Sequence, residues 1–236
     1  MCPAGDAHPP ERGFPDAAAA TALAGLVAAG PYLPWGAGTM RLGGLVAVCN
    51  DVVLGRRRYV VELGSGTSTL LLHRLLRSIW PDGGYRQVVV EHDAAWARWV
   101  AARLAEEGAG TTTTVLHVPL TPGAGAEPDL PWYDAARLGE GLDAALGGRA
   151  VDLLLVDGPP ADTAITVLAR WPALPVLAAR LEPGATVILD DAERPGEQEV
   201  LRRWERDHGV AVERRSASAG VALCRVPGAT DAPAHG

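Results

Sequence analysis

Short apolar runs alternate with longer amphipathic stretches along most of this chain. Five runs that are apolar or β-branched cover residues 59–64, 86–93, 111–120, 151–158 and 185–191. Each run has the length of a strand, and the stretches that follow repeat apolar residues at helical spacing. The pattern therefore predicts an α/β fold, with a doubly wound, mostly parallel sheet and helices on both of its faces.

The segments outside this alternation complete the predicted organisation. Two helices, at 16–29 and 41–54, precede the first strand and are separated by the sequence GPYLPWGAG. A Pro- and Gly-rich loop is expected at 119–131 and a proline-interrupted helix at 161–184. The last two apolar runs, at 210–215 and 220–226, predict a closing pair of strands.

Four segments are expected along the chain. They are an N-terminal tail at 1–15, a helical cap and lid at 16–58, a ligand-binding α/β domain at 59–226 and a C-terminal tail at 227–236.

Composition and charge narrow the class of protein. The 236 residues are 48% hydrophobic, which is enough for one sizeable core. A formal net charge of -7 disfavours a nucleic acid or an anionic membrane as partner. No apolar run approaches the roughly 20 residues of a membrane span, and the N-terminus lacks the pattern of a signal peptide. We therefore expect a soluble cytoplasmic protein whose ligand is a small molecule, with homo-oligomerisation left open.

Acidic residues follow four of the five predicted central strands. In parallel α/β sheets, ligands bind outside the carboxyl ends of the strands, so these acids are expected to line one crevice. The acids are Glu62, Glu91, Asp157, Asp190 and Asp191. The first strand end reads VVELGSGTSTLLL, in which Thr69 stands where a dinucleotide-binding loop has its last glycine. The chain has no lysine, which also disfavours a phosphate-binding P-loop.

The sequence ELGSGTS resembles the first motif, (E/D)xGxGxG, of the class I S-adenosylmethionine-dependent methyltransferases. Glu62, Gly64 and Gly66 match this motif, and Ser68 replaces its last glycine. The resemblance implies a Rossmann-like fold that binds S-adenosylmethionine. It also implies which residues bind it: Glu62, Gly64, Ser65, Gly66 and Ser68 at the methionine part, Glu91 at the ribose, and His92 and Asp157 beside them.

Other parts of the cofactor and acceptor sites are less clear from the sequence. Many family members hold adenine with an acid after the third strand, but here the sequence is LHVPL, so adenine contacts are not assigned. Trp132 and Tyr133 are predicted to line the acceptor pocket, whereas Trp96 and Trp99 are predicted to serve in packing. Residues 56–58, three arginines, are interpreted as a solvated charge run.

The fourth and fifth strand ends resemble those of cation-dependent O-methyltransferases. In those enzymes one acid after the fourth strand and two ligands after the fifth bind the cation, a pattern that Asp157, Asp190 and Asp191 match. Mg²⁺ prefers oxygen ligands, and a hydroxyl bound to such an ion ionises more readily. The sequence after the fourth strand, DGPP, departs from the (N/D)PP(Y/F) motif of amino-group methyltransferases. The resemblance therefore implies methylation of a hydroxyl, with Asp157 and Asp190 as the catalytic candidates.

Several alternatives remain open at this point. A metal-independent N- or O-methyltransferase would use Asp157 or Asp190 as a general base. The stretch LEPGATVILDDAERPGE is similar to a broad methyltransferase group in which a metal is not assured. An NAD-type oxidoreductase or a non-catalytic S-adenosylmethionine-binding protein could share the same fold.

Overall fold

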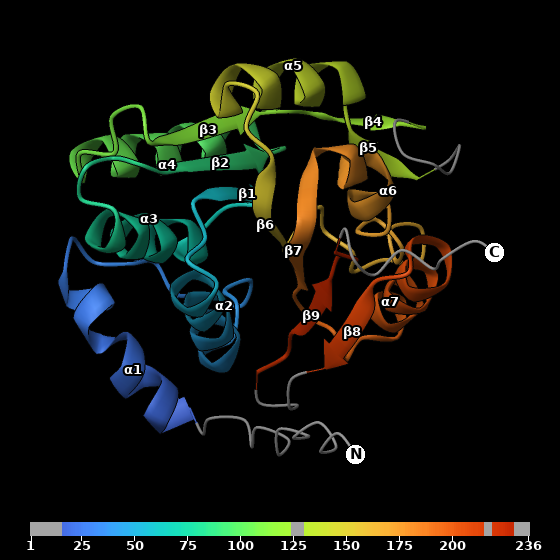
Figure 1. The fold of residues 1–236 in the computed structure, drawn as a ribbon, viewed down its shortest axis with the longest axis horizontal. Coiled ribbons are helices and arrows are strands. Elements are labelled where there is room, and N and C mark those ends of the chain that lie inside the picture. Colours follow the sequence, from blue (N-terminus) through green and yellow to red (C-terminus); the bar gives the residue numbers. More distant parts are fainter. Residues whose placement is uncertain (1–15, 124–129, 215–218, 229–236) are drawn as a thin grey trace, which may run out of the picture.

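The computed structural model describes residues 16–123, 130–214 and 219–228, and their centre is one seven-stranded sheet (Figure 1). The strand order is β3-β2-β1-β6-β7-β9-β8. The strands are β1 (Tyr59–Leu63), β2 (Arg86–Glu91), β3 (Thr113–His117), β6 (Val151–Val156), β7 (Leu181–Leu189), β8 (Ala211–Arg214) and β9 (Ala222–Arg225). Five neighbouring strands are parallel, whereas β9 runs antiparallel to both β7 and β8. The predicted doubly wound sheet and its closing strand pair are confirmed.

Helices cover both faces of the sheet (Figure 1). They are α1 (Asp16–Ala28), α2 (Leu42–Leu54), α3 (Thr67–Ile79), α4 (Ala94–Glu106), α5 (Ala135–Leu146), α6 (Ala173–Leu177) and α7 (Pro195–His208), with a 3₁₀ turn η1 (Ala178–Arg180). Helices α1 to α4 share one core with Leu153 and Leu155 of β6, and α5 to α7 share the other with Leu154 and Val156. The continuous apolar run of β6 is explained because its alternate side chains are buried on opposite faces.

The N-terminal helices pack directly onto this domain. Leu23 of α1 and Val48 of α2 belong to the same core as Leu71 of α3. Arg74 of α3 is buried and binds both carboxylate oxygens of Glu107 at 2.7 Å. Its guanidinium also donates to three carbonyls at and beyond the end of α1, those of Leu26, Val27 and Pro31. Residues 16–58 therefore share the core of the sheet, and the segment after α1 is fixed to α3.

Two predicted elements differ from the structure. The helix expected at 161–184 is replaced by consecutive turns, the five-residue α6 and η1. Pro172 stands directly before α6, where its ring disfavours a helix that continues from the preceding residues, whereas Pro175 is tolerated in the first turn of α6. Strand β7 begins at Leu181, earlier than predicted, and ends at Leu189, so Asp190 and Asp191 follow the strand.

The segment predicted as a loop at 119–131 contains part of a small hairpin. Strand β4 (Leu120–Pro122) pairs with β5 (Pro131–Tyr133) in an antiparallel ladder, while 124–129 lie outside the described residues. Trp132 and Tyr133 are both 0% exposed and belong to the core beneath α5. The prediction that they line an acceptor pocket is wrong, because both side chains are buried in this core.

The arginine run at 56–58 is also not a uniformly solvated segment. Arg57 is buried, and its guanidinium binds Asp51 at 2.9 Å and the hydroxyl of Thr186 at 2.6 Å. The tail predicted at 1–15 lies outside the described residues, as does the tail predicted at 227–236 from residue 229 onward. Within the described ranges, no helix combines the length and the apolar character needed to cross a membrane.

Candidate functional site

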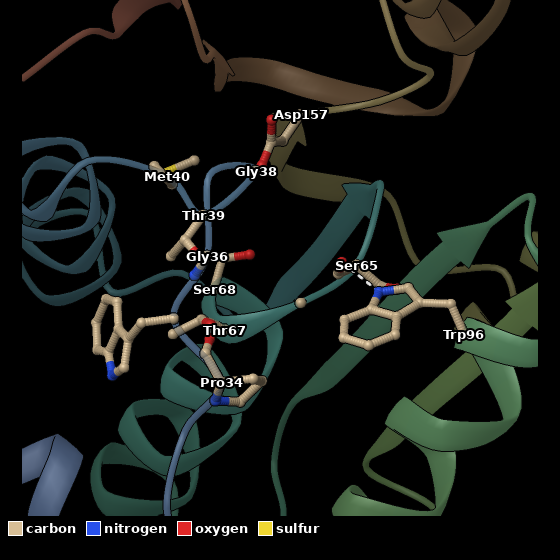
Figure 2. Close-up of a pocket in the computed structure, with 12 residues that line it drawn as sticks. Pro34, Gly36, Gly38, Thr39, Met40, Ser65, Thr67, Ser68, Trp96 and Asp157 are labelled. Carbon is tan, nitrogen blue, oxygen red and sulfur yellow. Dashed lines mark hydrogen bonds between the residues drawn. The ribbon is translucent and has the colours of Figure 1, made fainter.

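A crevice lies at the carboxyl ends of the central strands, where the strand order changes direction between β1 and β6. Two adjoining cavities form it, with volumes of about 360 and 280 Å³. The first, here the strap cavity, lies between residues 34–40, here the strap, and the start of α3 (Figure 2). The second, here the acid cavity, extends from Glu91 to Asp190 and Asp191. Both are lined by Gly38, Thr39, Ser65 and Asp157, so they form one continuous site.

The loop after β1 closes against the loop after β6. Gly64 has a φ of +88°, and a Cβ on it would lie 2.9 Å from the carbonyl oxygen of Asp157. A Cβ on Gly158 would lie 2.9 Å from the Gly64 nitrogen. A Cβ on Gly66, by contrast, would have no neighbour within 4 Å, and Gly66 lines the strap cavity. The first glycine therefore allows the two loops to touch, and Gly66 keeps space for a ligand.

Glu62 lies behind the wall of the crevice. It is 0% exposed, and its Oε1 accepts a 2.5 Å hydrogen bond from Ser68 Oγ. Burial raises its pKa to about 7, although the hydrogen bond from Ser68 opposes this shift. Ser68 lines the strap cavity, whereas Glu62 lines neither cavity. Glu62 thus fixes the side chain of a wall residue.

Glu91 ends β2 and forms part of the wall of the acid cavity. Its Oε2 accepts a hydrogen bond from Ser65 Oγ at 2.7 Å, and its Oε1 accepts one from the Asp93 amide at 2.8 Å. His92 Nδ1 lies 2.9 Å from the same Oε1. Burial acts to raise the pKa of Glu91. The hydrogen bonds, of which the one from His92 has the largest effect, outweigh burial and lower the pKa of Glu91 below its usual value. The same contact raises the pKa of His92. Glu91 is therefore an ionised acceptor at the crevice.

Trp96 is a site residue that the sequence interpretation missed. Asp93 caps α4, accepting a hydrogen bond from the Trp96 amide at 2.7 Å. The Trp96 ring stacks on Trp99 with 4.8 Å between centroids, as packing would require. Its indole also donates to the Ser65 carbonyl at 2.9 Å, and the ring lines the strap cavity (Figure 2). Its place in the first turn of α4, directly after a strand end, was the signal that could have identified it.

The strap is held near both of its ends. Thr67 Oγ1 donates to the Pro34 carbonyl at the start of α3. Arg41, just after the strap, forms a 2.7 Å ion pair with Glu193 in the loop after β7. Between these contacts the strap lines both cavities.

Three carboxylates converge at the far end of the acid cavity. Asp157, Asp190 and Asp191 each have an oxygen within 4.8 Å of the other two. Asp191 has a φ of +55°, a left-handed conformation that Asp adopts more readily than most residues. Burial and then the charge of Asp190 raise the pKa of Asp157 well above its usual range. Burial and then the charge of Asp191 raise the pKa of Asp190 to about 6. The group, here the acid cluster, therefore carries more negative charge than its surroundings readily stabilise.

Arg170 is the second site residue that the sequence interpretation missed. It lies in the turns before α6, is 4% exposed, and its Nη2 is 3.2 Å from both Asp157 Oδ1 and Asp191 Oδ2. Arg194 Nη2 reaches the same Asp191 oxygen at 2.9 Å. Glu197, in the first turn of α7, lies 3.8 Å from Arg170 Nη1. A lone arginine inside a predicted helix gave no signal of this role.

The acid cluster fits a hard divalent cation. Its donors are all carboxylate oxygens, the ligands that Mg²⁺ prefers, and they already converge. Asp157, Asp190, Asp191 and Glu197 carry four negative charges when ionised, against two positive charges on Arg170 and Arg194. These six described side chains therefore have a net excess of two negative charges, which either protons or one divalent cation would neutralise.

All the residues predicted to bind the cofactor or the metal, except Glu62, line one or both cavities. From the strap cavity to the acid cluster they are Gly66, Ser68, Ser65, Gly64, Glu91, His92, Asp157, Asp190 and Asp191. The structure therefore brings together residues that the sequence placed on four different strand ends.

No protein-family model matches the chain, and no curated protein matches it. Solved structures resemble it in fold. The SAH-bound methyltransferase PaMTH1 of Podospora anserina superimposes with a TM-score of 0.59 at 13% identity, over 91% of this chain and 89% of that chain. An O-methyltransferase of Bacillus cereus, also in complex with SAH, gives 0.53 at 15% identity, over 89% and 90% of the two chains. At these identities the likeness establishes the fold, which is the Rossmann-like fold of class I S-adenosylmethionine-dependent methyltransferases.

Proposed function

We propose that this protein transfers a methyl group from S-adenosylmethionine to a hydroxyl of a small molecule. The observation that carries this proposal is the single crevice in which the glycine loop and Glu91 adjoin the acid cluster. The two similar structures named above contain SAH, the product of such a transfer. Cavities of about 360 and 280 Å³ suit a small acceptor better than a macromolecule, and we propose a cytoplasmic location.

The residues of the strap cavity and Glu91 would bind the cofactor. The ionised Glu91 carboxylate is suited to accept hydrogen bonds from two ribose hydroxyls. The first turn of α3, with Thr67 and Ser68, offers amide groups and a helix N-terminus to the methionine carboxylate. Gly66 leaves room for this part of the ligand, and Glu62 holds the Ser68 hydroxyl in place. Trp96 would cover one side of the site.

The acceptor would lie in the acid cavity, where Asp157 adjoins both halves of the crevice. Asp157, Asp190 and Asp191 would hold Mg²⁺, which when bound supplies positive charge that favours ionisation of a hydroxyl. The same three residues orient the acceptor toward the cofactor, because they fix the end of the cavity at which it binds. The strap excludes water from the cofactor side.

A metal-independent reaction is the second candidate, and the contacts of Arg170 and Arg194 with the acid cluster favour it. Burial raises the pKa of Asp190, which suits a carboxylate that accepts a proton from the acceptor. Arg170 and Arg194 already neutralise part of the acid cluster. In this form of the proposal Asp190 is the general base, and Asp157 holds the acceptor.

Two measurements test the proposal. Calorimetric titration with S-adenosylmethionine, SAH and NAD should show binding of the first two, and binding of NAD alone would exclude the proposed function. Methylation of catechol and sugar acceptors, followed with labelled S-adenosylmethionine, should be detected and should decrease in Asp190→Asn. Full activity in EDTA would show that the reaction does not need a metal, as in the second candidate. Cofactor binding without transfer to any acceptor would instead indicate a non-catalytic binding protein.

A further inference from the structure

We infer that Arg170 is the built-in counter-ion of the acid cluster, which it keeps assembled without a metal and whose affinity for divalent cations it lowers. This inference concerns a positioning residue. It rests on the proposed function only in regarding the acid cluster as the reaction site, and cation binding can be measured without any reaction.

The contacts of Arg170 show how it could assemble the cluster. One nitrogen, Nη2, lies 3.2 Å from an oxygen of Asp157 and 3.2 Å from an oxygen of Asp191. The other, Nη1, donates to the Asp190 carbonyl at 3.0 Å. A single guanidinium therefore contacts all three acidic residues, two through carboxylates and one through the main chain. Its planar, multi-donor shape makes this possible, and a lysine could not reproduce it.

The same contacts connect separate segments of the chain. Asp157 follows β6, Asp191 follows β7, and Arg170 comes from the turns before α6. Nη1 also lies 3.8 Å from Glu197 of α7, whose side chain is 1% exposed. Buried acids at such separations repel one another, so removing the guanidinium leaves uncompensated charge in the interior. Arg170 therefore fixes the spacing of the carboxylates before any ligand binds.

A guanidinium in this position also opposes a metal ion. A cation bound by Asp157 and Asp191 would lie within a few ångströms of Arg170, and like charges at that distance repel strongly in a partly buried site. Arg194 contacts the same Asp191 oxygen, but its side chain is 48% exposed and can move into solvent. The side chain of Arg170 is only 5% exposed and lacks this freedom. Arg170 is therefore the residue expected to limit cation affinity.

The inference predicts that a neutral residue at 170 converts the cluster into a stronger cation site. Arg170→Met should bind Mn²⁺ about tenfold or more tightly than the wild type. Binding is followed by the loss of the free Mn²⁺ signal in electron paramagnetic resonance, on the protein without cofactor. In EDTA the variant should unfold roughly 10 °C below the wild type, and Mn²⁺ or Mg²⁺ should restore most of that loss.

Two further variants make the result specific. Arg170→Lys keeps one positive charge but not the branched contacts, so its Mn²⁺ affinity should lie between those of the wild type and Arg170→Met. If Arg170→Met does not fold in any buffer, the Mn²⁺ affinity of Arg170→Lys alone tests the inference. Arg180→Met is the matched control, because Arg180 pairs with Asp143 at 2.7 Å on the surface. It should leave Mn²⁺ affinity unchanged.

The outcomes separate this inference from the proposed function. It is overturned if neither variant at 170 binds Mn²⁺ more tightly than the wild type. It is also overturned if Mn²⁺ does not recover the stability of Arg170→Met. Calorimetry with SAH on the same samples reports on the function independently. If SAH fails to bind while Mn²⁺ binding rises as expected, the methyltransferase proposal fails and the role of Arg170 stands.

Discussion

Ser65 donates a 2.7 Å hydrogen bond to Glu91, and this contact joins the loop after β1 to the end of β2. Both residues line the acid cavity, and Ser65 lines the strap cavity as well. Glu91 thereby receives hydrogen bonds from its own strand end and from the neighbouring loop. The orientation of its carboxylate is fixed before a ligand arrives, which reduces the entropic cost of binding.

Glu91→Gln should weaken SAH binding about tenfold to a hundredfold. The amide loses the charge and one acceptor oxygen, and each charge-assisted hydrogen bond contributes roughly 1.5–3 kcal/mol. Isothermal titration calorimetry measures the effect. Glu106→Gln is the control, since Glu106 lies on the exposed side of α4 and pairs with Arg103. Equal affinity in Glu91→Gln and the wild type would show that Glu91 does not contact the ligand.

Alanine substitutions at Gly64 and Gly66 should affect different properties, the first the stability of the fold and the second the affinity for the ligand. Gly64→Ala should unfold at a markedly lower temperature, because the new Cβ would lie 2.9 Å from a backbone oxygen at a φ of +88°. Gly66→Ala should keep a melting temperature within a few degrees of the wild type, since nothing lies within 4 Å of its Cβ. It should nevertheless lose most SAH affinity, as the methyl group enters the strap cavity. Thermal unfolding and calorimetry on both variants test this, and full SAH affinity in Gly66→Ala would contradict it.

The raised pKa of Glu62 predicts how stability depends on pH. Its pKa is about 7 in the folded protein, against 4.5 for an ordinary glutamate. The folded state therefore holds this proton more tightly, and the contribution of Glu62 to stability, fully present below 4.5, is lost as pH rises to about 7. A shift of this size corresponds to roughly 3 kcal/mol.

Glu62→Gln removes this titration but keeps an acceptor for Ser68. The free energy of unfolding of the variant, relative to the wild type, should therefore rise between pH 4.5 and 7 and stay constant above that range. Urea unfolding at a series of pH values measures the difference. A difference that does not change with pH would show that Glu62 titrates as an ordinary carboxyl.

Arg74→Met should detach the N-terminal helix from the domain. The substitution leaves Glu107 buried without its partner and removes hydrogen bonds to the Leu26, Val27 and Pro31 carbonyls. A cost of about 3–5 kcal/mol is expected, together with faster amide exchange in α1 than in α5. Arg103→Met provides the comparison, because its pair with Glu106 is exposed and should contribute less than about 1 kcal/mol. Equal exchange in α1 of the two variants would contradict this role of Arg74.

The strand ends could be predicted from the sequence because their signals are local. Glu91 and Asp157 each follow a continuous apolar run, and parallel strands bring such ends to one edge of a sheet. The capping of α4 by Asp93 depends on an equally local feature, since Asp93 directly precedes the first turn of the helix. These features need only the order of residues along the chain.

Residues whose roles depend on distant partners could not be predicted. Arg57 donates a hydrogen bond to Thr186, which is 129 positions away in the sequence. Because of this contact, one residue of an apparently exposed arginine run is buried. Trp132 is turned into the core by a three-residue hairpin strand that has no clear sequence pattern. Arg170 acquires its role from acids on two other strand ends. In each case the tertiary fold, rather than local propensity, determines where the side chain lies.

Under the proposed function, the close contact between Gly64 and the loop of Asp157 and Gly158 would separate the chemistry of this protein from its selectivity. The two loops touch through main-chain atoms, so the distance from the glycine loop to the main chain of Asp157 does not depend on side-chain packing. Residues 160–162, by contrast, line the acid cavity and do not belong to the acid cluster. Under the proposed function, exchange of Pro160 or Asp162 would alter what enters the acid cavity while Arg170 and the carboxylates keep their spacing, so a screen for new acceptors should begin there.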